Sequence, residues 1–523
     1  MTGYQKPGVY VEEALLYNNG TTSSATSLAL FAGASNIGPL DTAVLCNTWS
    51  DYSINFGGDF SDVIGADDAS YTSYLPYAVY SYFQNGGKPC YVQRVVGTNK
   101  GDYSSVHIID TEEAIAFTVT ALSTGSVAIN NLSVVIKYID TVNKVFTLEV
   151  LKDGISAETF AYLSMDGKTG TRKVDTAIND AYSGSTLIKI TDIDTTTSPD
   201  SAITSAQHLT GGANPDIPAA SDYSQKLQDA VSKIEGPIIV NAVGYLKKSD
   251  GSYIAPLNIA SSTFNRGDIF IIIDGVRQRN AGESSSTYKT LVTNTGTALG
   301  VDQGDSYAAS YTPWIIIPDP KKAGSTITVP PGGAVAGVIS RIDSTIGVFR
   351  APAGLVATIT NAVGVDTKYT DSDLGALNEA NINAIRPVAG AGIAIMGART
   401  RKFYNADRYV SVRRTLIYIK ESMRRSTQYA LFENNDQRLW TQLQMTAERL
   451  LRPLWEAGGL RGNNAQEAYY IKCDSTLNTP AVIQSGEVRM EIGVALEYPA
   501  EFIVIRVTQF ESGGFTAEVQ PRG

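Results

Sequence analysis

The pattern of apolar and polar residues is clearest between residues 307 and 354. Residues 314–317 (WIII) form an apolar run that is long enough for a buried strand but too short to show a helical period. Residues 330–333 (PPGG) break the pattern, and small residues from 334 to 339 then predict one or two turns of closely packed helix. Residues 347–354 form another turn rich in glycine and proline. This order of strand, turn, helix and turn predicts a crossover unit of an α/β domain.

The α/β pattern continues on both sides of this stretch. Residues 28–32 predict a strand, and aromatic residues at helical spacing predict a helix over residues 71–83. A second helix is predicted over residues 223–234. Residues 268–274 (DIFIIID) form the uninterrupted apolar run that is typical of a strand buried in a parallel sheet.

Between residues 101 and 215 the pattern changes to alternation with a period of two. Apolar residues alternate with polar ones over residues 132–138 and again over residues 146–150. The polar residues 140–144 between these strands predict a hairpin. The segment therefore predicts a small all-β domain inserted into the α/β domain.

The chain from residue 386 predicts two amphipathic helices followed by strands. Asn434 and Asn435 are predicted to cap the second helix, and residues 488–492 and 502–507 are predicted strands. The apolar face of the first helix consists of Val412, Leu416, Ile419 and Met423. The apolar face of the second consists of Leu439, Leu443, Leu450 and Leu454.

Two extended arms are predicted at residues 1–20 and 511–523. Val9, Tyr10 and Val11 are β-prone, but three residues are too few for a strand that is stable alone. Such a segment can pair with the edge of another sheet, in the same subunit or in a neighbour. The residues expected to take part in strand pairing between subunits are Val9, Tyr10, Val11, Phe502, Val504 and Phe510.

Composition indicates a folded, multidomain protein. The chain has 523 residues, of which 43% are hydrophobic and 18% charged. No run of roughly 18 uncharged apolar residues is present, so no membrane helix is predicted, and the start lacks a signal peptide's apolar core. Synthesis in the cytoplasm is therefore expected. The net charge of −10 argues against general nucleic-acid binding.

Few residues are available for catalysis or metal binding. His107 and His208 have no carboxylate or cysteine partner at motif spacing, so neither a catalytic triad nor a zinc site is indicated. Cys46, Cys90 and Cys473 are far apart in sequence and are expected to be reduced, buried residues. Glycine-rich and calcium-like segments all miss their motif spacing. No catalytic residue, metal site or cofactor is therefore predicted.

One segment has a strong excess of positive charge. Residues 386–425 hold ten Lys or Arg and two acids, which leaves a net charge of −18 for the rest of the chain. Such a run is often a solvated helix face, but its concentration in an acidic protein favours an acidic partner. At 100° per residue, Arg413, Lys420 and Arg424 group beside the apolar face of the first helix.

Motifs along most of the chain resemble the contractile-tail sheath proteins of phages and related injection machines. The motifs, in order, are Phe56-Gly57-Gly58, Asn85-Gly86-Gly87, Cys90-Tyr91-Val92, Pro313-Trp314, Asp319-Pro320, Val329-Pro330-Pro331-Gly332, Ala336-Gly337, Arg341-x-Asp343, Gly347-Val348-Phe349-x-Ala351-Pro352-Ala353, Gly397-x-Arg399-Thr400, Cys473-Asp474 and Pro499-Ala500-Glu501-Phe502.

The resemblance implies a fold that combines α/β and all-β parts. A subtilisin-like α/β domain (residues 21–100 and 216–385) is split by the inserted small β domain (residues 101–215). An α+β C-terminal inner sheath domain (residues 386–510) follows, with extended N- and C-terminal arms at either end. Pro330, Pro331, Gly332 and Pro352 are then rigid corners of the α/β domain, and Arg341 and Asp343 a structural pair or a subunit contact.

The resemblance also implies a structural role without catalysis. Sheath subunits polymerise as stacked six-membered rings around a tail tube and contract to drive the tube through a cell envelope. The expected partners are other copies of the chain, the tail tube protein, and baseplate and tail terminator proteins, with no membrane insertion and no direct nucleic-acid contact. The expected location is a virion tail or phage-derived particle, assembled in the bacterial cytoplasm. Arg413, Lys420 and Arg424 are expected to face the tube.

The sequence leaves two other classes of protein open. A viral capsid or other shell protein would share symmetry and β arms. A hydrolase on the subtilisin-like scaffold would need a Ser-His-Asp constellation, which the sequence does not show in motif context.

Overall fold

The computed structural model describes residues 28–501 with internal gaps. The residues outside the description are 1–27, 59, 111, 126–130, 141, 168–169, 181–182, 192, 194–198, 200–204, 251, 255–265, 276, 278–305, 404–405 and 502–523. Both predicted arms therefore lie outside the described residues, together with all six residues expected to pair between subunits. Among the helices that are described, none is both long enough and apolar enough to cross a membrane.

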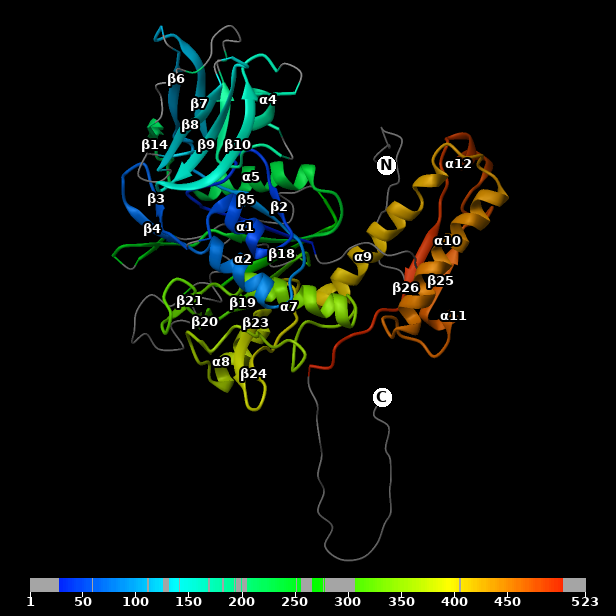
Figure 1. Ribbon diagram of the computed structural model, residues 1–523. Helices are drawn as coiled ribbons and strands as arrows, with labels where there is room; N and C mark the ends of the chain where they lie inside the picture. The colour runs from blue at the N-terminus through cyan, green and yellow to red at the C-terminus, as the bar shows by residue number, and fades with distance from the viewer. Residues whose placement is uncertain are drawn as a thin grey trace, which may run out of the picture.

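An eight-stranded sheet forms the centre of the α/β part (Figure 1). Its inner strands are parallel, and one antiparallel strand is added at each edge. The predicted strands at 28–32 and 268–274 are confirmed as inner strands. In spatial order the strands are β2 (Val44–Cys46), β5 (Cys90–Arg94), β1 (Leu28–Gly33), β15 (Ile238–Val243), β18 (Ile269–Asp274), β19 (Ala308–Thr312), β23 (Ile382–Val388) and β24 (Gly392–Ile395).

Helices cover both faces of this sheet. Successive strand residues point to opposite sides, so Phe31 packs with α1 (Trp49–Phe56), α2 (Leu75–Gln84) and α7 (Gly332–Thr345) in one core. Its neighbour Leu30 packs against α5 (Ala220–Lys233) in another. Burial on both faces explains why β1 and residues 269–273 of β18 are continuously apolar.

Helix α7 is longer than the sequence predicted. It spans 14 residues instead of one or two turns, and the helix predicted over residues 71–83 begins only at Leu75. A Cβ on Gly333 would lie 2.2 Å from the Ala78 carbonyl oxygen, and one on Gly337 would lie 2.5 Å from that of Tyr82. The small residues therefore allow α7 to pack closely along α2.

The predicted crossover connection is present, but it starts from β19 (Ala308–Thr312) and not from the apolar run at residues 314–317. The apolar run at 314–317 forms β20 (Ile315–Pro318), which pairs antiparallel with β21 (Thr326–Val329) and β22 (Gly364–Val365) outside the main sheet. The connection from β19 to its parallel neighbour β23 contains α7 and α8 (Asp371–Glu379). A further small sheet consists of β17 (Tyr253–Ile254), β16 (Leu246–Lys248), β4 (Ser70–Ser73) and β3 (Val63–Ile64).

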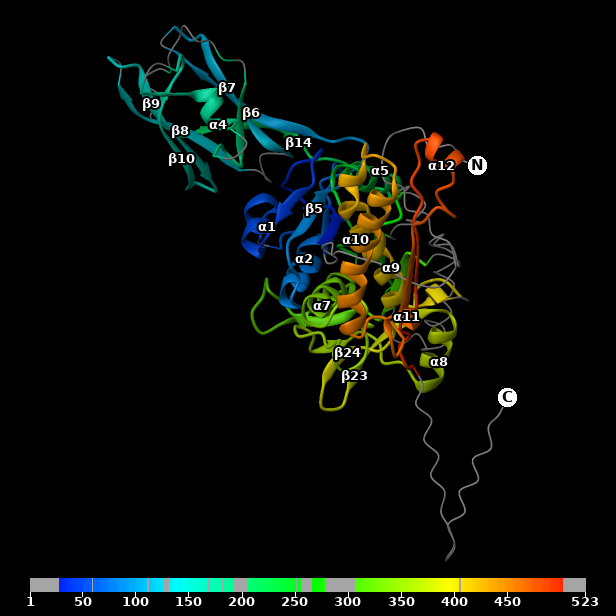
Figure 2. The same ribbon diagram turned by 90° about the vertical axis from the view of Figure 1, so that its right-hand side faces the viewer.

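The strands between β5 and α5 form two sheets with their own apolar core, which project from one end of the α/β part (Figure 2). The predicted hairpin is confirmed, because β8 and β9 pair antiparallel. The strands extend from Asp102 to Ala213, and the boundaries at residues 101 and 215 stay a prediction. The elements are β6 (Asp102–Ile109), β7 (Ile115–Thr124), β8 (Leu132–Asp140), β9 (Val145–Lys152), β10 (Ile155–Ser164), β11 (Arg172–Lys173), α4 (Val174–Ile178), β12 (Ile188–Thr191), β13 (Gln207–His208) and β14 (Thr210–Ala213).

Arg94 connects these sheets to the α/β part through hydrogen bonds. Its side chain is fully buried and donates to the carbonyl oxygens of Ser35 (2.7 Å), Gly38 (3.0 Å) and Thr124 at the end of β7 (3.4 Å). The Gly38 amide donates in turn to Ser123 Oγ at 2.9 Å. The junction is therefore a set of directional hydrogen bonds in the protein interior.

The C-terminal part is built on α9 (Val410–Ser426) and α10 (Gln437–Glu456), with a short sheet of β25 (Tyr469–Lys472) and β26 (Glu491–Val494). The predicted cap is wrong: Asp436, not the asparagines, accepts hydrogen bonds from the amides of Arg438 and Leu439. The strand predicted at 488–492 begins only at Glu491, and β25 was not predicted. The remaining elements are η2 (Ala406–Arg408), η3 (Gln428–Ala430), α11 (Ala465–Ala468) and α12 (Pro480–Gln484).

Candidate functional site

The two histidines lie on strands of the inserted sheets, His107 on β6 and His208 on β13. His107 Nδ1 is 2.9 Å from Thr118 Oγ1 on the neighbouring strand β7, and His208 is exposed on β13. Within the described ranges, no group of three His, Cys, Asp or Glu residues is arranged to hold a metal ion. Both histidines are accounted for as strand residues of the inserted sheets.

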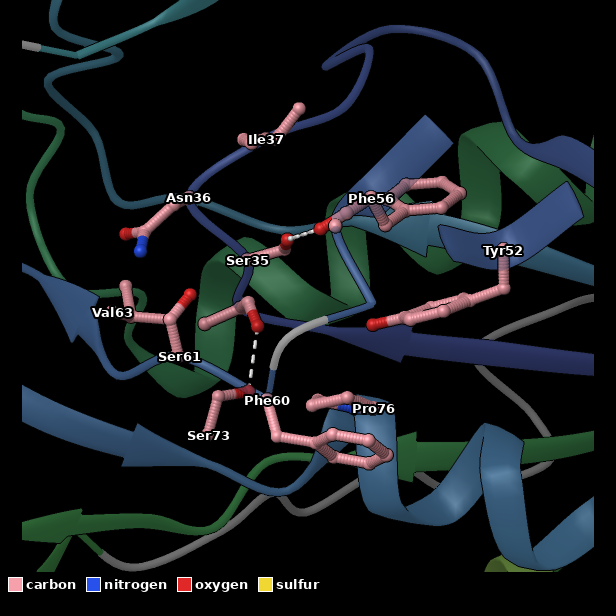
Figure 3. Close-up of a pocket in the computed structure, with 12 residues that line it drawn as sticks. Ser35, Asn36, Ile37, Tyr52, Phe56, Phe60, Ser61, Val63, Ser73 and Pro76 are labelled. Atoms are coloured by element: carbon pink, nitrogen blue, oxygen red, sulfur yellow. Dashed lines mark hydrogen bonds between the residues drawn. The ribbon is translucent and has the colours of Figure 1, made fainter. Parts of the chain in front are cut away.

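A small cavity lies between residues 35–37, α1 and β4 (Figure 3). Its volume of about 20 Å³ has room for a single water molecule. Ser35 Oγ donates to the Phe56 carbonyl oxygen at 3.1 Å, and Ser73 Oγ to that of Ala34 at 2.6 Å. These hydroxyls hold the loop in place, and the space between them is too small for a substrate.

Asp274 is a buried carboxylate at the carboxyl end of the inner strand β18. Its Oδ1 accepts from the Gly332 amide, at the start of α7, at 2.6 Å, and its Oδ2 accepts from Asn241 Nδ2 at 3.0 Å. Burial raises the pKa of Asp274 to about 6, although both hydrogen bonds act in the opposite direction. No sequence motif marks this residue, although a carboxylate that ends an apolar parallel strand is a signal that could have indicated it.

Asp274 helps to hold the turn at residues 330–333, which was predicted to be a rigid corner. A Cβ on Gly332 would lie 2.4 Å from Asn241 Nδ2 and 2.8 Å from Asp274 Oδ1, so a larger residue would have to displace these two side chains. Pro330, Pro331 and Pro352 are also buried. The arrangement ties the turn before α7 to the sheet, and it gives Asp274 a structural role.

The titration of Asp274 predicts a measurable pH dependence. Because its folded pKa of about 6 exceeds its ordinary value of 3.8, the ionised form is destabilising above pH 6 and this cost disappears as the pH falls towards 4. We expect the stability of the wild type relative to Asp274→Asn to increase by about 2–3 kcal/mol between pH 7 and pH 4. Urea unfolding of both proteins checks this, since the comparison cancels other carboxylates. A difference that does not change with pH would contradict the assignment.

Arg413 does not lie on an exposed basic face, so this prediction is wrong. Its side chain is 3% exposed, its Nη2 donates to Asp407 Oδ2 at 2.6 Å, and its guanidinium lies 4.4 Å from the centre of the Tyr307 ring. The helical spacing was correct, but it could not show that η2 and the turn before β19 cover this side of α9. Arg413 therefore fastens α9 within the subunit.

Arg341 and Asp343 do not pair with each other; each fastens α7 to another element. Arg341 donates to the carbonyl oxygens of Asn85 (3.2 Å) and Thr358 (2.6 Å). Asp343 accepts two hydrogen bonds from Arg414 of α9, at 2.8 and 2.5 Å, and both side chains are at most 5% exposed. This bidentate pair joins the α/β part to the C-terminal part.

The outer end of α9 retains partly exposed cations. Glu421 is buried and accepts from Arg424 at 2.6 Å and from Arg425 at 2.7 Å, while those two side chains remain 38% and 42% exposed. Burial would raise the pKa of Glu421, but the hydrogen bonds from both guanidinium groups hold it below its usual value. Lys420 is also partly exposed. Of the three cations predicted to lie on one face, only Lys420 and Arg424 reach the surface.

The sheet of β25 and β26 has two edges without a partner strand among the described residues. The strands pair in register from Tyr469–Val494 to Lys472–Glu491. A two-stranded sheet is marginal on its own, and here Tyr469 packs against Leu450 and Leu451 of α10. Unpaired edges are templates for further strands, so this sheet is a candidate assembly site.

Two family models match the chain in consecutive order. Residues 261–401 match the phage tail sheath protein central domain, and residues 405–510 match the phage tail sheath C-terminal domain. The tail sheath protein of Enterobacteria phage T4 is 29% identical over 165 residues. That match covers 30% of this chain and 24% of the phage protein, so it spans about a quarter of the relative's length.

Solved sheath structures share the fold over nearly the whole chain. The sheath complex of PVC, an extracellular contractile injection system, in its contracted state covers 97% of this chain and 99% of its own, with a TM-score of 0.56 at 20% identity. A sheath tail protein from Listeria innocua covers 87% of this chain and 90% of its own, with a TM-score of 0.55 at 11% identity. The two matched domains place residues 261–401 and 405–510 in the phage tail sheath protein family, and the solved sheath structures share the fold of nearly the whole chain.

Proposed function

We propose that this chain is the repeating subunit of a contractile sheath, in a phage tail or a phage-derived injection device. Subunits assemble as stacked six-membered rings around a tail tube and contract to drive the tube through a cell envelope. The observation that carries the proposal is the pair of sheath domain matches within a fold shared over 97% of the chain with a contracted sheath. Energy is stored in subunit contacts, so firing requires no cofactor or nucleotide.

Buried ion pairs within the subunit support the proposal that each subunit moves as a nearly rigid unit during contraction. The buried Arg414–Asp343 pair joins α9 to α7, and Arg413 with Asp407 holds the start of α9. Buried, hydrogen-bonded ion pairs have preferred geometries and resist partial displacement. The α/β part and the C-terminal part can therefore rotate together as one rigid unit, while the contacts between subunits change.

Connections between subunits are assigned to the arms. In this proposal the arms at residues 1–20 and 511–523 pair with the open edges of the sheet of β25 and β26 in neighbouring subunits. Strand addition supplies directional main-chain hydrogen bonds, and linkage keeps neighbours at high effective concentration while the lattice rearranges.

Truncation of the arms tests this function. Removal of residues 1–20, or of residues 511–523, should leave a folded monomer that does not polymerise, because each truncation removes one of the arms proposed to connect subunits. Circular dichroism checks the fold, and sedimentation velocity measures assembly. Normal cylinders from both truncated proteins would refute the role of the arms.

The partly exposed end of α9 is proposed to contact an acidic tube surface. Lys420→Glu with Arg424→Glu should leave sheath rings able to form but should reduce co-sedimentation with tail tubes at least tenfold, because attraction becomes repulsion. Arg452→Glu is the matched control, since its exposed side chain (64%) lies on α10 of the same part. Equal co-sedimentation of the two variants would exclude these cations from the tube contact.

Two alternatives remain testable. A shell protein would form closed particles instead of cylinders. A subtilisin-like hydrolase would react with a serine-directed probe, and we expect no labelling. Baseplate and tail terminator proteins are proposed as partners at the two ends of the sheath.

A further inference from the structure

Cys46 and Cys90 are neighbours across two antiparallel strands. The register of β2 and β5 places them directly opposite each other. Residues that face each other in an antiparallel pair have Cα atoms about 4.5–5.5 Å apart, which lies within the range of about 4.4–6.8 Å that a disulfide spans. The two residues are 44 positions apart in sequence, so neither a CxxC motif nor local spacing could reveal the pair.

Both side chains point to the same face of the sheet. Cys46, Cys90 and Val92 all belong to the core beneath α1 and α2. Both cysteines are completely buried and are not bonded to each other in this structure. The third cysteine, Cys473, is equally buried but belongs to a separate core with Leu439 and Trp440.

We infer that Cys46 and Cys90 form a latent disulfide site that can lock the edge strand β2 onto the central sheet. The bond would close a loop that contains α1, β3, β4 and α2. Cross-linking across such a loop restricts the unfolded chain and so stabilises the fold. The site does not depend on the proposed function, because it rests only on the strand register and the core.

The reaction is a thiol–disulfide exchange with a small-molecule disulfide such as oxidised glutathione. The thiolate of one cysteine attacks a sulfur of the oxidant and releases one glutathione thiolate, leaving a mixed disulfide. The second cysteine then attacks the protein sulfur of that intermediate and releases the other glutathione. The protein loses two hydrogens and two electrons, and one oxidised glutathione becomes two reduced molecules.

The native fold protects the site from this reaction. Burial raises the pKa of Cys46 to about 12, with a smaller contribution from Asp51, and burial also raises the pKa of Cys90. The thiolate is the reactive form, so exchange must wait until β2 opens. The oxidation rate should therefore follow the population of the opened edge, which low concentrations of urea increase.

Oxidation of the purified chain tests the site. We incubate the wild type with oxidised glutathione in buffer and in sub-denaturing urea, and identify cross-linked peptides by mass spectrometry without reduction. The expected result is a bond between Cys46 and Cys90, formed faster in urea, and a midpoint of thermal unfolding that is a few degrees higher. Cys473→Ala should behave like the wild type, and Cys46→Ala should form no intramolecular bond.

Three outcomes would overturn the inference. One is the absence of the 46–90 bond even after complete unfolding and refolding in oxidised glutathione. Another is a bond to Cys473 as abundant as the 46–90 bond. The third is an oxidised protein that melts no higher than the reduced one. Circular dichroism of the alanine variants confirms that they are folded before any result is interpreted.

Discussion

Replacing Asp343 by alanine should lower the free energy of unfolding by about 3–5 kcal/mol, because Arg414 would remain buried without its partner. The pair makes two hydrogen bonds at 2.8 and 2.5 Å, and both side chains are at most 5% exposed. Urea unfolding followed by tryptophan fluorescence and circular dichroism measures the change. Arg452→Ala is the control, because its exposed pair with Glu456 should contribute less than about 1 kcal/mol.

A double variant separates the interaction from the burial of charge. Asp343→Leu with Arg414→Met removes both charges, and such apolar replacements are often neutral or stabilising. We expect the double variant to recover most of the stability that Asp343→Ala loses. If the single and double variants are equally unstable, the cost comes from packing of α7 against α9 and not from an unpaired charge.

Replacing Gly333 by alanine should also be severely destabilising. Its Cβ would lie 2.2 Å from the Ala78 carbonyl oxygen, which is backbone and cannot turn away, so α7 would have to move off α2. We expect a loss of roughly 3 kcal/mol from overpacking, read as a lower midpoint of thermal unfolding.

Gly375→Ala is the matched control for this substitution. Gly375 also lies in a helix, α8, but a Cβ there would have nothing within 4 Å. Alanine is about 1 kcal/mol more favourable than glycine inside a helix, so this variant should be neutral or slightly more stable. Equal losses at Gly333 and Gly375 would show that close packing of α7 on α2 is not the cause.

The sequence predicted the elements in which the burial of side chains follows a regular pattern. Residues 269–273 are apolar because helices cover both faces of β18, and residues 145–150 alternate because β9 buries only every second residue. The extent of α7 was underestimated, since its glycines disfavour a helix locally and are retained for contact with α2.

The roles of individual charged residues could not be read from spacing. Arg413 and Arg424 lie on one line of α9, but their surroundings differ: Asp407 and Tyr307 enclose the first, while the second reaches the surface. Asp274 obtains its role from a glycine 58 residues later in the chain. Such partners come together only in the folded chain, so neither helical nor strand periodicity in the sequence can indicate these contacts.

Electron microscopy of the purified chain, alone and with preformed tail tubes, tests the central proposal most directly. We expect hollow cylinders built from stacked rings of six subunits, with tubes inside them when tubes are supplied. Closed shells, or monomers that remain unassembled in the presence of tubes, would contradict a contractile sheath.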